Sequence, residues 1–67
     1  MNKNRMRQLR IQAGVSITEA LGYLNISYSM LSKIERNERS PGTNLIPKIS
    51  ELYNCSIDKI YEAMEKN

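Results

Sequence analysis

The 67-residue sequence contains no histidine, phenylalanine or tryptophan, and it has one cysteine, Cys55. A single cysteine excludes an internal disulfide, and without histidine the common zinc-binding spacings cannot form. No stretch approaches the ~20 consecutive apolar residues of a membrane span, and the N-terminus lacks the apolar segment of a signal peptide. We therefore expect a cytoplasmic protein with no metal, no cofactor and no membrane partner, which is stabilised by aliphatic packing or by oligomerisation.

The same inventory disfavours an enzyme. There is no histidine to transfer protons, and Asp58 is the single aspartate. The sequence also lacks a Ser/His or Cys/His arrangement and a glycine-rich phosphate-binding loop. We therefore expect a protein that works by binding.

The charge of the chain is unevenly distributed. Ten lysines and arginines against seven acidic residues give a net charge of +3. Residues 1–39 hold seven basic and three acidic residues, a net +4, whereas residues 40–67 hold three basic and four acidic residues, a net −1. One part of the molecule is thus suited to a polyanion, and an ordinary solvated face is the alternative.

Apolar spacing and capping residues predict five short helices and no sheet. The first carries Met6, Leu9, Arg10 and Ala13 on one face and ends at Gly14, a residue that readily adopts a left-handed conformation. A second helix is predicted from Ile17, because Ser16 and Glu19 have the spacing of a capping box, and Asn25 can end it. Ser27 can cap a third helix. The predicted inner residues of these two helices are Ala20, Leu21, Leu24, Leu31 and Ile34.

The remaining helices are also marked by caps. Asn37 can end the third helix, and the fourth begins near Asn44 or Leu45, because Pro47 is tolerated only in a first turn. Asn54 can end the fourth helix, and Ser56 can cap the fifth. The predicted apolar stripes are Leu45, Ile49 and Leu52 on the fourth helix and Ile57, Ile60, Tyr61 and Met64 on the fifth.

Residues 16–39, SITEALGYLNISYSMLSKIERNER, resemble the helix-turn-helix of the phage repressor and Cro-like group, the Xre family. The resemblance continues on both sides, in the R-x-x-R-x-x-x-G pattern ending at Gly14, in Pro41, and in N-x-S-I-D-x-I over residues 54–60. It implies an all-α, five-helix single domain over residues 1–67, with a helix-turn-helix at about 16–36 whose third helix reads double-stranded DNA. It also implies a homodimer on a palindromic operator, acting as a transcriptional repressor.

The resemblance also implies which residues contact base edges. The positions that contact bases in the family also face outward when residues are counted around the third helix from Ser27. They are Tyr28, Ser29, Ser32 and Lys33. The ammonium of Lys33 matches the O6 and N7 acceptors of guanine, whereas Tyr28 has two further options, a phosphate or a thymine methyl.

Contacts to the DNA backbone are expected at helix N-termini and in the connection after the third helix, where amides, hydroxyls and cations can meet phosphates. The candidates are Ser16, Ile17 through its amide, Ser27, Arg36, Asn37, Arg39 and Ser40, with Lys3 and Arg5 as further N-terminal cations. Relatives frequently carry a glutamine at the position of Ile17, so isoleucine removes a polar side-chain contact there.

Arg10 and Glu35 match an ion pair of the family that ties the first helix to the end of the third. Because breaking a partly buried pair costs several kcal/mol, we interpret it as structural, with a phosphate contact of Arg10 as the alternative.

The fifth helix is the expected dimer surface. Its apolar residues Ile57, Ile60, Tyr61 and Met64 exceed what one small core requires, although Ile57 and Ile60 can instead close that core. A different function is a protein-binding module such as an antitoxin, with DNA binding secondary. That function predicts an exposed apolar patch, to which Ile17, Tyr23, Met30 and Met64 can contribute.

Overall fold

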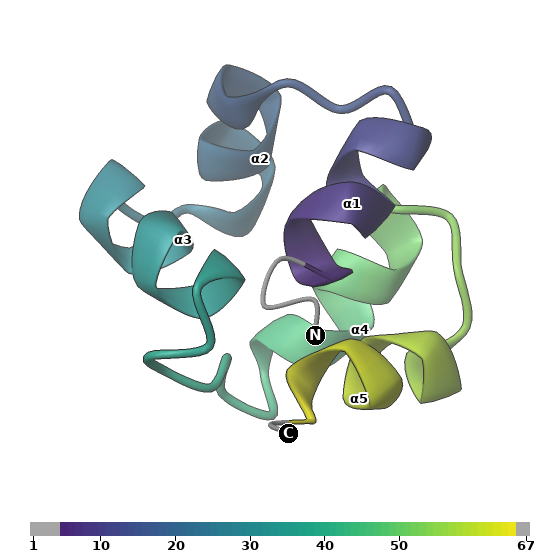
Figure 1. Ribbon diagram of the computed structural model, residues 1–67. Coiled ribbons are helices and arrows are strands. Elements are labelled where there is room, and N and C mark those ends of the chain that lie inside the picture. The colour runs from purple at the N-terminus through teal and green to yellow at the C-terminus, as the bar shows by residue number, and fades with distance from the viewer. Residues whose placement is uncertain (1–4, 66–67) are drawn as a thin grey trace.

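The computed structural model describes residues 5–65, and this part of the chain forms five helices and no strand, as predicted (Figure 1). The helices are α1 (Arg5–Gln12), α2 (Ile17–Leu24), α3 (Tyr28–Glu35), α4 (Leu45–Leu52) and α5 (Ile57–Met64). Helix α2 packs against α3 and α4, whereas α5 packs against α1 and α4. Helix α3 packs only against α1 and α2, which leaves much of its surface open.

Three of the helices begin at the predicted serines. Ser16 Oγ accepts a hydrogen bond from the Glu19 amide at 3.0 Å, and the Glu19 carboxylate accepts one from the Ser16 amide at 3.0 Å, which completes the capping box. Ser27 and Ser56 cap α3 and α5 through single bonds of 3.1 and 3.2 Å. These bonds satisfy amides that have no partner within the helix.

The first four helices are each followed by a residue in the left-handed region: Gly14 (φ 75°), Asn25 (φ 57°), Asn37 (φ 61°) and Asn54 (φ 54°). In all four turns the next amide bonds back to the carbonyl five residues earlier, the pattern of a Schellman motif. The four bonds are Val15 to Arg10, Ile26 to Leu21, Glu38 to Lys33 and Cys55 to Ser50, at 2.9–3.2 Å. The same C-terminal Schellman motif therefore ends each of the first four helices.

The core is built from aliphatic side chains and one tyrosine. It comprises Met6, Val15, Ala20, Leu24, Leu31, Ile34, Ile46, Ile49, Tyr53, Ile60 and Ala63. The predicted inner stripe of α4 is wrong in part, because Ile46 and Tyr53 are buried together with Ile49, whereas Leu45 and Leu52 are only partly buried. Since α4 packs against both α2 and α5, its buried face is centred between these neighbours. Ala13 is exposed because α1 ends before it.

Helix α5 carries two apolar faces. Ile60 and Ala63 are 0% and 3% exposed and close the core, whereas Ile57 and Tyr61 are 43% and 50% exposed. The prediction of one shared face is therefore wrong for Ile60, which is enclosed by its own chain and cannot contact a partner. Ile57 and Tyr61, four residues apart, remain on the outer face, with Met64 partly buried.

Arg5 joins the two ends of the described chain. Its Nη1 donates a hydrogen bond of 2.9 Å to the Glu62 carbonyl of α5. Arg5 thus ties α1 to α5, and Lys3 lies outside the described residues.

Candidate nucleic-acid interface

Helix α3 is held by its inner face and presents its outer face to solvent. Leu31 and Ile34 are 3% and 2% exposed and anchor the helix in the core. The side chains proposed to contact bases lie at positions i, i+1, i+4 and i+5 on the other side. Tyr28, Ser29 and Lys33 are exposed, and Ser32 is half-buried. All four are therefore brought together on one surface of the helix.

The first residues of α2 and α3, Ile17 and Tyr28, line the same hollow, and both helices are capped by exposed serines. Ser16 and Ser27 use their hydroxyl oxygens to accept from Glu19 and Met30, so their hydroxyl protons stay available to an acceptor. The Ile17 amide is the first in its helix and has no intrahelical acceptor. This arrangement suits an anion such as a phosphate.

The connection after α3 carries the predicted backbone contacts in exposed positions, apart from half-buried Asn37. Arg36 Nε lies 3.0 Å from Glu38 Oε2, and the two side chains are 53% and 55% exposed. An exposed pair of this kind contributes at most about 1 kcal/mol, so a phosphate can displace Glu38 from Arg36. Arg39 and Ser40 follow on the same exposed connection.

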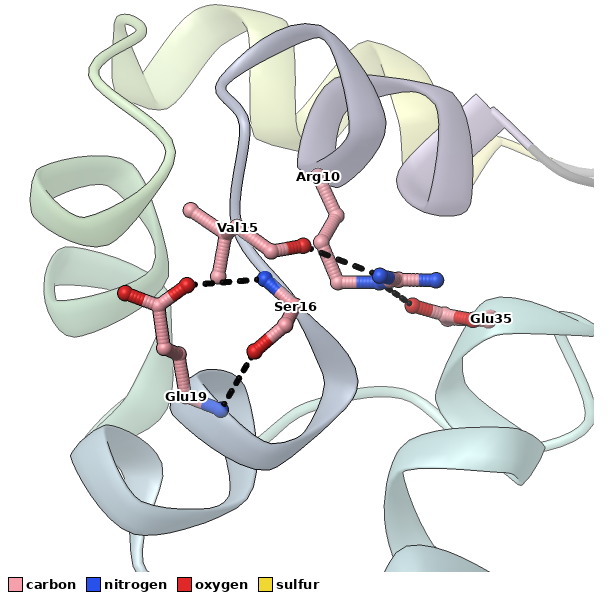
Figure 2. Close-up of polar contacts among 5 residues, drawn as sticks. All are labelled: Arg10, Val15, Ser16, Glu19 and Glu35. Atoms are coloured by element: carbon pink, nitrogen blue, oxygen red, sulfur yellow. Dashed lines mark hydrogen bonds and ion pairs between the residues drawn. The ribbon is translucent and has the colours of Figure 1, made fainter.

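Arg10 and Glu35 form the predicted ion pair, with Arg10 Nε 2.8 Å from Glu35 Oε2 (Figure 2). The side chains are 8% and 12% exposed, and Arg10 Nη1 also donates to the Val15 carbonyl at 3.0 Å. The guanidinium therefore joins α1, the α1–α2 turn and the end of α3, three segments that Figure 2 shows converging on it. Its bonds are satisfied within the protein, which favours the structural interpretation.

Tyr53 is a buried tyrosine that the sequence did not single out. Burial raises its pKa to about 12, the nearby Glu35 carboxylate adds to the increase, and Arg10 partly opposes it. Tyr53 therefore stays protonated at neutral pH. Tyr53 is the C-cap residue of α4, and its side chain belongs to the core.

A hollow of about 320 Å³ opens beside α3, between α1 and the start of α2. Its lining includes three guanidinium groups, those of Arg7, Arg10 and Arg36, and one carboxylate, Glu35, which is already paired with Arg10. Arg7 is exposed, and its side chain has no hydrogen-bond or ion-pair partner among residues 5–65. Sequence reasoning missed Arg7 as a site residue, although it lies one helical turn before Arg10 and could have been found from that spacing.

A second hollow, of about 380 Å³, lies where the end of α1 meets the α4–α5 turn. Tyr53, Cys55 and Lys59 are among its lining residues. Burial raises the pKa of the Cys55 thiol, an effect that the charge of Lys59 partly opposes. The thiol is thus held in its protonated, weakly nucleophilic form at neutral pH.

A family model described as Helix-turn-helix matches residues 6–60, which contain all of α2, α3 and α4. The chain belongs to the Xre-type helix-turn-helix family. Members of this family are DNA-binding transcriptional regulators. The family match and the five-helix architecture confirm the predicted fold class.

A curated relative is the HTH-type transcriptional regulator ImmR of Bacillus subtilis (strain 168), which is 39% identical over 66 residues. The match covers 94% of this chain and 52% of the relative, so the chain spans about half of that protein's length. No solved structure matches the chain at a significant level. Over residues 5–65, none of the helices has the length and hydropathy needed to cross a lipid bilayer.

Proposed function

We propose that the protein binds double-stranded DNA in a sequence-specific manner and regulates transcription, with α3 in the major groove. The observation that carries this proposal is the outward face of α3, where four hydrogen-bonding side chains lie beside two helix N-termini and the exposed cationic side chain of Arg7. An α-helix fits the major groove of B-DNA, and a second helix joined by a short turn fixes its angle. Here α2 and the Asn25 turn provide that support.

The proposed contacts fall into two groups. Tyr28, Ser29, Ser32 and Lys33 face base edges, and Lys33 donates to guanine. Phosphates are bound by the Ser16 and Ser27 hydroxyls, the Ile17 amide, Arg36, Asn37, Arg39 and Ser40. We add Arg7 to these contacts, because it lines the hollow beside α3.

A two-fold dimer completes the proposal. Helix α5 does not pack against α3, and Figure 1 shows the two helices well separated, so a partner on α5 leaves the reading helix free. The exposed Ile57 and Tyr61, together with the partly buried Met64, provide the apolar contact, without Ile60. Two copies of α3 then enter successive major grooves about 34 Å apart on a palindromic operator. Occupation of this operator represses transcription by blocking access to it.

The protein-binding alternative gains no support from the exposed side chains. Met30 and Met64 are partly buried against the core, and the Tyr23 hydroxyl donates to Glu51 of α4 at 2.5 Å. Ile17 and Tyr23 are 38% and 46% exposed, but they lie six positions apart on α2 and therefore on different faces of that helix. The four predicted contributors do not make one apolar patch.

Selection of bound sequences from a random DNA pool tests the proposed function. We expect enrichment of a palindrome with half-site centres one helical turn apart. Titration of the selected DNA and of random DNA at two salt concentrations should give steep salt dependence for both and tighter binding of the selected sequence. A pool with no enriched sequence would contradict the proposal.

A further inference from the structure

Two apolar side chains face the same hollow beside α3. Ile17, the first residue of α2, is 38% exposed, and Tyr28, the first residue of α3, is 61% exposed. Both line the hollow of about 320 Å³, together with buried Leu31. The hollow therefore has an apolar wall at the point where the N-termini of α2 and α3 meet.

The other side of this hollow is cationic. Arg7 and Arg36 line it, and the third guanidinium, that of Arg10, is neutralised by the partly buried Glu35. Arg36 has only the exposed Glu38 as its ion-pair partner, which a phosphate can displace. Two further positive charges around an apolar wall disfavour an aliphatic protein segment as the occupant, because burying them there has a high desolvation cost. They match instead an apolar group that lies next to phosphates.

The DNA major groove offers one such group. The C5 methyl of thymine projects into it a short distance from the sugar-phosphate backbone, and side chains contact it through apolar surface. We propose that the Ile17 side chain and the Tyr28 ring together contact a pyrimidine C5 methyl in each half-site, which makes Ile17 a specificity-determining residue. This inference rests on the proposed function, and both thymine and 5-methylcytosine carry the recognised methyl.

A uracil scan of the selected operator tests the contact. Uracil pairs as thymine does and lacks only the C5 methyl. At one thymine in each half-site, we expect replacement by uracil to raise the dissociation constant of the parent protein about fourfold, the effect of losing one buried methyl-sized group. The Ile17→Ala variant should show a smaller difference in affinity between the thymine and uracil operators at that position, because only the Tyr28 ring then contacts the methyl.

A matched control uses a second exposed isoleucine. Ile11 is 55% exposed on α1 and does not line the hollow, so Ile11→Ala should keep the full fourfold effect of uracil. Ile17→Thr provides a second variant that keeps the β-branched shape at the helix start while placing a hydroxyl in the apolar wall. Circular dichroism melting of each variant establishes that it is folded.

A further arm distinguishes the two sources of the methyl. At the sensitive position, the T·A pair is replaced by C·G or by 5-methylcytosine·G. A gain in affinity of about fourfold on cytosine methylation, seen in the parent and reduced in Ile17→Ala, identifies the methyl of either base as the ligand. If cytosine methylation does not raise the affinity of the parent, while replacement of thymine by uracil still lowers it, thymine is the source of the methyl.

The proposal is overturned if no uracil substitution weakens the parent, or if Ile17→Ala keeps the parent's sensitivity. Failure of the proposed function is a separate result, because the parent itself would then enrich no operator and the scan would have no substrate.

Discussion

Arg10 is the one buried charged residue among the described side chains, at 6% exposed. Its guanidinium bonds to both Glu35 and the Val15 carbonyl, so its removal leaves a carboxylate and a backbone oxygen with no donor. We expect Arg10→Met to lower the free energy of unfolding by about 3–5 kcal/mol. Adding Glu35→Leu should recover much of this loss, because no unpaired charge then remains. Urea denaturation of the two single variants and the double variant measures the coupling, and strictly additive losses would show that the two side chains do not interact.

Tyr53 makes the stability of the protein sensitive to alkaline pH. Its folded-state pKa of about 12 lies above the ordinary value of 10.0, so the unfolded chain releases this proton at a lower pH than the folded chain does. The stabilisation is complete below pH 10 and is lost as the pH rises towards 12, with a total of about 2–3 kcal/mol. We expect the free energy of unfolding to fall less between pH 9 and pH 11.5 in Tyr53→Phe than in the parent, as measured by urea denaturation. Tyr61→Phe, at a half-exposed tyrosine, is the control and should retain it.

At the scale of the helices, α3 is expected to provide specificity. Lys33→Ala should relax preference at one base pair per half-site, at a cost of about 1–3 kcal/mol on the selected operator and little on random DNA. Arg39→Gln, in the exposed connection after α3, should lower the affinity for selected and for random DNA about equally. Fluorescence titration of both DNAs measures these effects, and an equal loss for Lys33→Ala would refute its role in reading bases.

Helix α1 is expected to provide affinity without specificity. Because the Arg7 side chain lines the hollow and has no hydrogen-bond or ion-pair partner within residues 5–65, we expect Arg7→Gln to weaken the binding of selected and random DNA alike. The slope of log affinity against log salt should fall by about one unit, the effect of losing one phosphate contact. Lys59→Gln on α5 removes the same charge away from α3 and should leave the slope unchanged. Identical slopes for the parent and Arg7→Gln would exclude the contact.

The whole molecule places its two proposed surfaces on different helices, α3 for DNA and α5 for a second copy. We expect Tyr61→Glu to introduce charge into the apolar stripe of α5 and so to produce a folded monomer. This monomer should bind random DNA almost as the parent does but lose operator specificity, because one α3 covers half of the site. Sedimentation on the operator measures the assembly, with Tyr61→Phe as the control that stays dimeric. A dimeric Tyr61→Glu variant, or a monomeric parent on its operator, would disprove the assembly.

The sequence alone determined where the helices begin and end. Ser16, Ser27 and Ser56 cap helices as predicted, and the asparagines at 25, 37 and 54 take the predicted left-handed conformation. These features depend on hydrogen bonds between residues three to five positions apart, so a local reading of the chain contains the necessary information. The Arg10–Glu35 pair spans 25 residues and was predicted only through the family resemblance.

Tertiary structure decided which apolar and charged side chains are available for binding. Helical periodicity placed Ile60 with Tyr61, but the packing of α5 between α1 and α4 buries the first and exposes the second. In the same way, the fold directs Arg5 to α5 and Arg7 to the hollow beside α3, although both belong to one basic N-terminal segment. A side chain's partners depend on which helices surround it, and that arrangement follows from the packing of the whole chain and not from spacing within one helix.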